Sequence, residues 1–344
     1  MAGLSVKYMG LTLKNPLIVG SCGLTGNLKN IIEFAEKGAG AVVLKSIFEE
    51  QIRMETEHFL KSDNEKVKEW TSTFDSIVGN TPYAYEEAAA YIANFAKEHT
   101  LKDYLAFVAE AKKSVAIPVI ASIHCVSNYD WTYFARRIQE AGADALELNI
   151  YVLPSDFNTT GQQNEQVYLD ILKEVKKHLT IPVALKIGSY FSGLANMLKS
   201  LSESGADALV LFNKPYNPDI DIHKLTISVS DIYSGENQYQ KTLRWIASLS
   251  GMVSCNLAAT TGILNAETAI KQILAGADAF QIVSAIYKHG SDIIPEILKG
   301  IESWMEEQKF DSVSAFKGKL SKSNIEHPIA YDRVQFMKHY ANIV

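Results

Sequence analysis

The sequence has little cysteine, no long apolar run and no excess of positive charge. Its three cysteines, an odd number with no Cys-x-x-Cys pair, exclude a disulfide framework and argue against iron–sulfur and zinc-ribbon sites. No stretch approaches the roughly 18 apolar residues that a membrane helix needs, and Met1–Lys7 lacks the apolar core of a signal peptide. With 33 basic and 39 acidic residues, the net charge of −6 argues against nucleic acid as the main partner.

What is present is the composition of a globular enzyme. Apolar residues make up 47% and charged residues 21% of the chain, which excludes disorder for most of it. Free thiols suit a reducing compartment, so we expect a cytoplasmic protein without a membrane partner. The eight histidines show no metal-ligand spacing, so no metal site is expected. The 344 residues contain no low-complexity linker, which favours a single domain over residues 1–344.

A short pattern recurs four times along the chain. It reads Gly38-Ala-Gly-Ala-Val-Val-Leu44, Gly142-Ala-Asp-Ala-Leu-Glu-Leu148, Gly205-Ala-Asp-Ala-Leu-Val-Leu211 and Gly276-Ala-Asp-Ala-Phe-Gln-Ile282. Each copy follows a helical stretch, and glycine suits the left-handed position just past a helix end. The pattern therefore indicates a turn from a helix into an apolar strand.

Eight apolar strands are expected, separated by helical segments, and most read as continuous apolar runs of the kind found in parallel sheets. We place them near residues 16–21, 40–46, 118–123, 144–150, 182–188, 207–213, 252–259 and 278–284. This order predicts an α/β fold, a (β/α)8 TIM barrel. A doubly wound sheet is the alternative, but Gly20-Ser-Cys-Gly-Leu-Thr25 lacks the glycine spacing that such folds carry after their first strand.

Three segments exceed a minimal barrel. Residues 4–15 read as an N-terminal hairpin that turns at Met9-Gly10 and plugs the bottom of the barrel. Residues 47–116 form a long insertion with helical stretches near 86–98 and 101–114, and residues 214–240 contain an extra strand pair. Long insertions after barrel strands lie on the top face, where they shape the active site.

The active site of such a barrel lies at the carboxyl ends of its strands. Two lysines, Lys45 and Lys186, end otherwise apolar strands, and burying an ammonium without a partner is costly. They favour a pair of cations facing an anion or an electron-rich ring. Asn149 and Asn213 end two further strands, where an amide both donates and accepts. The hydroxyl-rich ends of the last two strands suit a phosphate, at Thr260, Thr261, Gly262, Ser284 and Ala285.

These residues resemble the dihydroorotate dehydrogenase family, in particular its soluble class 1 branch and the dihydroorotate dehydrogenase-like relatives. The resemblance runs from about residue 4 to 320 and is carried by collinear segments: Asn15-Pro-Leu-Ile-Val-Gly-Ser21, Leu44-Lys-Ser46, Glu147-Leu-Asn149, Leu185-Lys186, Phe212-Asn213, Thr261-Gly-Ile263 and Gln281-Ile-Val-Ser-Ala285. It implies a (β/α)8 barrel that binds FMN, commonly forms a homodimer, acts in pyrimidine metabolism and transfers hydride between a small-molecule substrate and the flavin.

The resemblance also implies residue roles. Lys186 is expected beside the N1–O2 edge of the flavin, where it stabilises the charge that develops on reduction. Further flavin contacts are expected from Ser21, Lys45, Ser46, Ser122 and Asn149. The phosphate is expected against residues 260–262 with Ser284 and Ala285, and the substrate against Lys45, Asp75, Asn149 and Asn213.

The chain departs from the family pattern at several of these positions. The loop after the fourth strand reads Asn149-Ile-Tyr-Val-Leu-Pro154, which puts Val152 where the family has its catalytic cysteine or serine. The nearest replacements as base are Ser155 and Asp156. A substrate asparagine becomes Asp75, whose carboxylate repels that of orotate. The serine that follows the sixth-strand asparagine becomes Lys214. On the phosphate side, a glycine becomes Val283 and the glycine turn is thinned to residues 259–262.

Three hypotheses remain open on the sequence alone. The leading one is an FMN-dependent oxidoreductase with an altered substrate. The second is a flavin-binding barrel without dihydroorotate activity, suggested by Val152. The third is a flavin-free barrel lyase that uses Lys186 as a Schiff-base amine.

Overall fold

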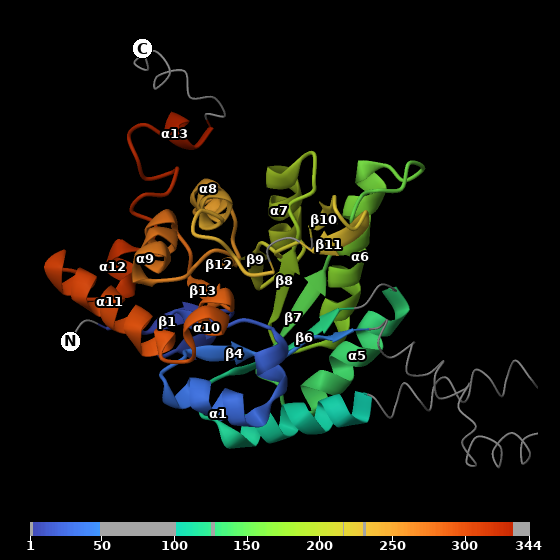
Figure 1. Ribbon diagram of the computed structural model, residues 1–344, viewed down its shortest axis with the longest axis horizontal. Coiled ribbons are helices and arrows are strands. Elements are labelled where there is room, and N and C mark those ends of the chain that lie inside the picture. The colour runs from blue at the N-terminus through green and yellow to red at the C-terminus, as the bar shows by residue number, and fades with distance from the viewer. Residues whose placement is uncertain (1–2, 49–100, 125–127, 216, 230–231, 333–344) are drawn as a thin grey trace, which may run out of the picture.

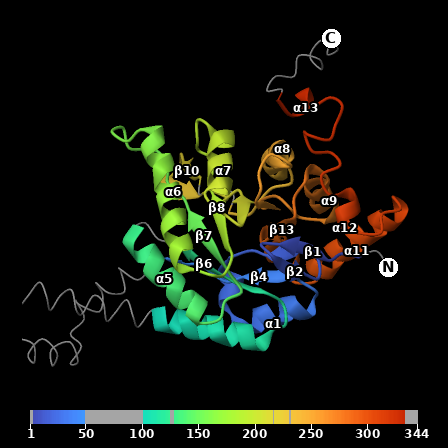
Figure 2. The same cartoon turned by 180° about the vertical axis from the view of Figure 1, so that it is seen from behind.

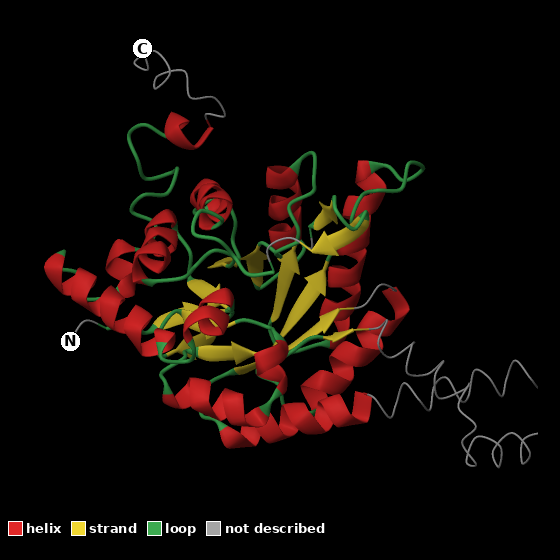
Figure 3. Cartoon of the chain, viewed as in Figure 1, coloured by secondary structure: helices red, strands yellow, loops and turns green. Residues whose placement is uncertain are grey.

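The computed structural model describes residues 3–48, 101–124, 128–215, 217–229 and 232–332. Within them, parallel strands form a closed ring enclosed by helices (Figures 1 and 3). The ring strands are β3 (Leu17–Val19), β4 (Ala41–Val43), β6 (Val119–His124), β7 (Ala145–Ile150), β8 (Val183–Ile187), β9 (Ala208–Leu211), β12 (Asn256–Ala259) and β13 (Ala279–Ile282). Each pairs with the next in this order, and β13 pairs with β3 to close the ring. The predicted (β/α)8 barrel is confirmed.

Helices cover the outside of the ring. In chain order they are α1 (Leu28–Glu36), the stretch 101–114, α5 (Asn128–Glu140), α6 (Gly161–His178), α7 (Leu194–Glu203), α8 (Tyr239–Leu249), α9 (Ala266–Ala275), α10 (Ser284–His289), α11 (Ile293–Glu307), α12 (Val313–Phe316) and α13 (Ile329–Asp332). Seen from either side, α5, α6 and α7 flank one part of the ring and α8, α9 and α11 another (Figures 1 and 2). No helix in the described ranges is long and apolar enough to cross a membrane.

The recurring glycine pattern forms the turns at the bottom of the barrel, as expected. Its glycines have positive φ, for example 122° at Gly276, which favours glycine over residues with a side chain. The aspartate two residues later has a role that the pattern did not suggest. Asp278 accepts a hydrogen bond of 2.8 Å from the backbone N–H of Leu257 and one of 2.6 Å from Lys317. Asp144 and Asp207 repeat this arrangement, with Lys112 and Lys176 as their partners.

The N-terminal hairpin closes the bottom of the barrel, as predicted. Strands β1 (Val6–Tyr8) and β2 (Leu11–Leu13) pair antiparallel around Met9 and Gly10, whose φ angles are both positive. Tyr8, Met9 and Leu13 are buried against a ring interior built largely from alanine, which leaves room for them. The Met9 N–H donates to the side chain of Asn256 at the start of β12, over 2.7 Å.

The insertions agree in part with the sequence. Strands β10 (Pro218–Asp221) and β11 (Thr226–Val229) form the predicted antiparallel pair. The helical stretch 101–114 is present, whereas the one near 86–98 lies outside the described residues. Two short elements follow the first two ring strands: the 3-10 helix η1 (Gly23–Gly26) and β5 (Ile47–Phe48), which pairs with β6.

The seventh strand begins later than predicted. β12 starts at Asn256, whereas the apolar run suggested a start at residue 252. The backbone N–H groups of Ser254 and Cys255 both donate to the hydroxyl of Ser202, over 3.1 Å each. Because these two N–H groups bond to the Ser202 hydroxyl, they do not bond to a neighbouring strand, and residues 252–255 form a turn ahead of β12.

Candidate functional site

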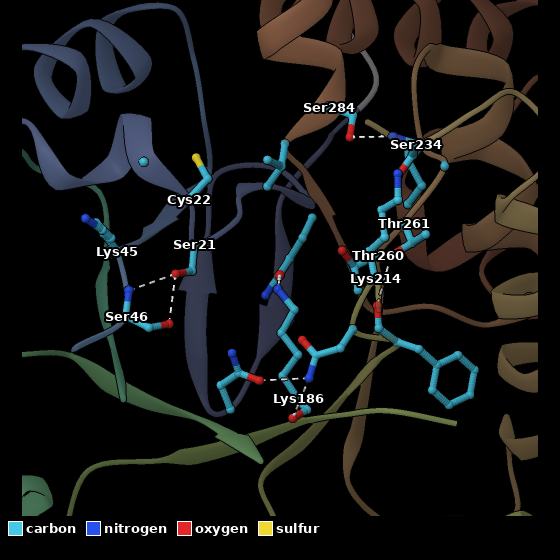
Figure 4. A pocket seen from close by; sticks show the side chains of 18 of the residues that line it. Ser21, Cys22, Lys45, Ser46, Lys186, Lys214, Ser234, Thr260, Thr261 and Ser284 are labelled. Carbon is cyan, nitrogen blue, oxygen red and sulfur yellow. Dashed lines mark hydrogen bonds between the residues drawn. The ribbon is translucent and has the colours of Figure 1, made fainter. Parts of the chain in front are cut away.

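A cavity of about 380 Å³ opens at the carboxyl ends of the ring strands. Ten of the residues predicted to act at the site line it (Figure 4): Ser21, Lys45, Ser46, Asn149, Lys186, Asn213, Thr260, Thr261, Gly262 and Ser284. They come from seven strand ends that are far apart in the sequence. The barrel brings them together because all of its strands point the same way.

Lys186 lies on the floor of the cavity and is only 8% exposed. Its Nζ donates to the side-chain oxygen of Gln281 over 3.0 Å and lies 3.7 Å from the carboxylate of Glu147. Gln281 in turn donates to Glu147 over 2.6 Å. The buried ammonium is therefore held by a buried carboxylate, and it keeps further N–H donors for a bound molecule.

Asn149 and Asn213 meet above this network. The amide of Asn213 donates to the side-chain oxygen of Asn149 over 2.8 Å. This bond orients both amides and leaves the Asn149 NH2 group and the Asn213 oxygen for a ligand. The two residues, predicted at the ends of two separate strands, lie side by side in the cavity lining.

Three serines form a chain of hydroxyls on another wall. Ser21 accepts a hydrogen bond from the Ser46 N–H over 3.0 Å, and the Ser46 hydroxyl lies 2.8 Å from that of Ser122. Ser122 is fully buried and does not line the cavity. Its N–H donates to the hydroxyl of Tyr104, and burial raises the pKa of that hydroxyl well above its usual range. Ser122 therefore holds the Ser46 hydroxyl by a hydrogen bond from a buried position behind the cavity wall.

The last two strands end in a turn rich in hydroxyl groups. Thr261 donates from its hydroxyl to the carbonyl of Phe212 over 2.9 Å. Gly262 has a φ of 79°, and a Cβ atom there would come within 2.3 Å of the Tyr239 nitrogen, so only glycine fits. Ser284 faces the cavity at the start of α10, whereas Ala285 is fully buried behind it.

The loop after β7 does not reach the cavity. Val152 packs partly buried against the core, with its N–H bonded to the Tyr168 hydroxyl over 2.9 Å. Ser155 is exposed and lies outside the cavity lining. Asp156 is exposed as well, and the hydroxyl of Thr159 holds its pKa below the usual range. Asp156 therefore closes a turn of this loop. Asp75 lies outside the described residues.

Several cavity residues were not singled out from the sequence. They are Cys22, Gly23, Phe48, Phe212, Ile232, Ser234, Ile263 and Gln281. Glu147, beneath the cavity, was missed too. Both Glu147 and Gln281 are polar residues inside otherwise apolar strands, the same signal that identified the two lysines.

The lining has a clear chemical character. It contains three lysines, five hydroxyl residues besides Ser46, and three amides, but no carboxylate or imidazole among the described residues. No group of three or more His, Cys, Asp or Glu side chains is placed to hold a metal ion in the described part of the chain. Such a surface donates hydrogen bonds and positive charge, so it suits an anionic or electron-rich ligand. The fold and the site together define a barrel enzyme with a cationic cavity at its strand ends.

Comparison with known proteins narrows this class. The family model for dihydroorotate dehydrogenase matches residues 84–305. The chain is 28% identical over 322 residues to the "Dihydroorotate dehydrogenase B (NAD(+)), catalytic subunit" of Thermoplasma volcanium, which covers 92% of this chain and 98% of that protein. The protein of the same name from Pyrococcus furiosus is 28% identical over 330 residues, which cover 93% of this chain and 99% of that protein. The NAD-dependent dihydropyrimidine dehydrogenase subunit PreA of Escherichia coli K12 is 24% identical over 340 residues, which cover 94% of this chain and 77% of that protein.

The chain belongs to the dihydroorotate dehydrogenase family. Through this membership it is a flavin-dependent oxidoreductase of the type that acts on CH–CH groups. The resemblance carried by the short strand-end motifs is thereby confirmed.

Proposed function

We propose that this cavity binds flavin mononucleotide and that the enzyme transfers hydride between the flavin and a small substrate. The observation that carries the proposal is the cluster of Lys45, Lys186 and hydroxyl donors at the strand ends. A flavin gains negative charge when it is reduced, and its phosphate is anionic, so cations suit both. The volume of about 380 Å³ is within the range of small-molecule sites.

The residues present fit this group. When bound, the flavin supplies the acceptor or donor of the hydride. Lys186 holds a positive charge at the cavity floor, where its remaining N–H donors stabilise an anionic ring edge. Asn149 and Asn213 offer a paired donor and acceptor that orient a planar heterocycle. Ser21, held by Ser46, supplies a further hydroxyl on the wall.

We further propose that dihydroorotate is not the substrate. Its oxidation calls for a base beside the flavin, and Val152 at that loop position takes no proton. Beyond Asn149, no residue of this loop lines the cavity, and the thiol of Cys22 and the serine hydroxyls in the lining come from other parts of the chain. A substrate that gives up its hydride without losing a proton to this loop is consistent with these residues.

The Schiff-base lyase receives less support. An amine nucleophile has to be neutral. The carboxylate of Glu147, 3.7 Å from the Lys186 nitrogen, stabilises a positive charge there instead. Membership of an oxidoreductase family also favours the flavin chemistry.

We also propose that the enzyme is a homodimer, joined through the strand pair β10–β11. Ile220 and Ile227 lie opposite each other on this pair and are 67% and 77% exposed. Burying such a pair against a second copy removes apolar surface from water. Light scattering after gel filtration is expected to give twice 38.1 kDa, and Ile227→Glu is expected to give the monomer. A monomeric wild type would contradict the proposal.

The main test is an absorbance spectrum of the purified protein, followed by anaerobic titration with candidate reductants. Flavin bands that bleach with a small reductant other than dihydroorotate support the proposal. A colourless protein that does not take up FMN overturns it, and rapid bleaching by dihydroorotate overturns the substrate assignment. In Lys186→Met the reduced flavin loses its cation, so we expect its midpoint potential to fall by roughly 30 mV, equivalent to about 1.4 kcal/mol.

A further inference from the structure

The ring interior carries a layer of buried polar side chains directly below the cavity, formed by Glu147, Lys186 and Gln281. Side chains alternate along a strand, so each of the three shares its face of the strand with the residue two positions earlier. In all three strands that residue is an alanine of the apolar cluster that fills the ring: Ala145, Ala184 and Ala279. The polar layer therefore lies between an apolar interior and the cavity, where an unpaired charge is costly.

Gln281 stands between the two charges and keeps them apart. Its amide nitrogen donates to one oxygen of Glu147 over 2.6 Å, and its amide oxygen accepts from Lys186 over 3.0 Å. The second oxygen of Glu147 is buried, lies 3.7 Å from the ammonium and makes no hydrogen bond to a described residue. A lysine donates and a carboxylate accepts, so the amide bridges them in this orientation alone. The ammonium is thus held on the cavity side, short of a direct bond to the carboxylate.

Glu147 supplies the counter-charge of Lys186. Other titratable groups near the pair are Lys45, Lys214 and Cys22 in the cavity lining and Tyr8 in the ring interior. None of them is a carboxylate, and the lysines add positive charge. Burial raises the pKa of the Tyr8 phenol well above its usual range, and the charge of Glu147 adds to this effect, so the phenol stays neutral. No carboxylate lines the cavity in the described part of the chain.

The protonation of Lys186 therefore depends on Glu147. A flavin gains negative charge when it is reduced, and a cation at the cavity floor stabilises that form. With the carboxylate beside it, the ammonium is balanced whether or not the flavin is charged. Without the carboxylate, a buried ammonium that faces a neutral ring is destabilised and gives up its proton. The amine then takes a proton up again only when the flavin is reduced.

We propose that Glu147 and Gln281 are positioning residues for flavin reduction, which keep Lys186 protonated in both redox states and hold its ammonium on the cavity side. The inference rests on the proposed flavin site. In the wild type, the flavin takes up two electrons and one proton as the hydride of the substrate, and Lys186 balances the new negative charge. Without Glu147, the same two electrons are accompanied by two protons, because solvent also protonates the neutral Lys186 amine.

The test measures the midpoint potential of the bound flavin against pH. One pH unit is a tenfold change in proton concentration, so one proton per two electrons lowers the potential by about 30 mV per unit and two protons by about 59 mV. Between neutral pH and the usual lysine pKa of about 10.4, we expect the smaller slope in the wild type and the larger one in Glu147→Gln. The smaller slope in Glu147→Gln overturns the role of Glu147.

Gln281→Met keeps both charges and removes the bridge between them. The second oxygen of Glu147 can then bond to Lys186 directly, which draws the ammonium away from the cavity. We expect the slope to stay as in the wild type. The reduced flavin is expected to bind about tenfold less tightly relative to the oxidised form, which lowers the potential by about 30 mV. An unchanged potential overturns the role of Gln281.

A control and a second variant separate this inference from a fault in folding. Glu174→Gln removes a carboxylate on the exposed face of α6 and is expected to leave the potential and its slope unchanged. Circular dichroism shows whether each variant is folded, and Gln281→Met decides if Glu147→Gln is not. A wild type that binds no flavin defeats the proposed flavin site itself, whereas a flavin-bound wild type with a slope of about 59 mV per pH unit overturns this inference alone.

Discussion

Glu147 and Lys186 face each other from the neighbouring strands β7 and β8, with a carboxylate oxygen 3.7 Å from the ammonium nitrogen. Both side chains are nearly withdrawn from water, at 2% and 10% exposure. Gln281 reaches them from β13, on another part of the ring, and bonds to both. The charge on the cavity floor is therefore fixed by three strands, and a bound ring meets a cation whose position is already set.

Breaking this buried pair is expected to cost stability. In Glu147→Gln the ammonium loses its counter-charge, so we expect the free energy of unfolding to fall by about 3 kcal/mol. Lys186→Met is expected to cost a similar amount. The double variant is expected to lose less than the sum of the two, because no charge is left buried alone. Urea denaturation monitored by fluorescence measures all three.

The control for that series is Glu174→Gln on the exposed face of α6. Glu174 pairs with Lys177 and His178 in water, so its loss is expected to leave the free energy of unfolding almost unchanged. A fully additive double variant, or a Glu147→Gln protein as stable as this control, would contradict the role of the pair.

A second stability prediction concerns the bottom of the barrel. Asp278 is 8% exposed and accepts hydrogen bonds from the Leu257 N–H and from Lys317. Asp278→Ala leaves a backbone donor and a lysine without their acceptor, so we expect a loss of about 2 kcal/mol. The flavin affinity is expected to stay unchanged, because this end lies opposite the cavity. Asp219→Ala on the exposed strand β10 is the matched control, and an equal loss there would refute the prediction.

Cys22 provides a chemical probe of the cavity. Its side chain lines the cavity, whereas Cys255 lies outside the lining and burial raises the pKa of its thiol. In a Cys125→Ser background, saturating FMN is expected to slow alkylation of Cys22 by about tenfold or more, corresponding to site occupancy above about 90%. Alkylation of Cys255 is expected to be slow with or without flavin, since little thiolate is present. Mass spectrometry of the labelled peptides measures both rates. Equal rates for Cys22 with and without flavin would place the flavin elsewhere.

The alkaline stability of the protein depends on Tyr151. Burial, assisted by the neighbouring Tyr190, raises the pKa of Tyr151 to about 12, against about 10 in an unfolded chain. Between these values the folded protein keeps a proton that the unfolded chain loses. Stability from this group is therefore fully present below pH of about 10 and falls as the pH rises toward about 12. Urea midpoints measured across this window are expected to fall less steeply in Tyr151→Phe, and identical slopes in the two proteins would rule the contribution out.

Much of the fold was readable from local patterns. The glycine in each Gly-Ala-Asp-Ala turn is needed at a positive φ, and each apolar strand is buried on both faces. Both features restrict the residue types at adjacent positions, so the sequence shows them directly. The Met9–Gly10 turn of the hairpin is local in the same way. The start of β12 was not predictable, because a distant side chain, Ser202, captures the backbone donors before it.

For the site, the sequence by itself determined which residues stand at strand ends, and so identified Lys45, Lys186, Asn149 and Asn213. Only the tertiary structure decided how they are used. Gln281 is 95 residues from Lys186, and Ser234 meets Ser284 across 50 residues, so both contacts exist only once the ring has closed. The Lys214 side chain runs toward Ser234, and the Ser155 loop lies outside the cavity. Both positions depend on packing between segments that are distant in the sequence, so no local pattern predicts them.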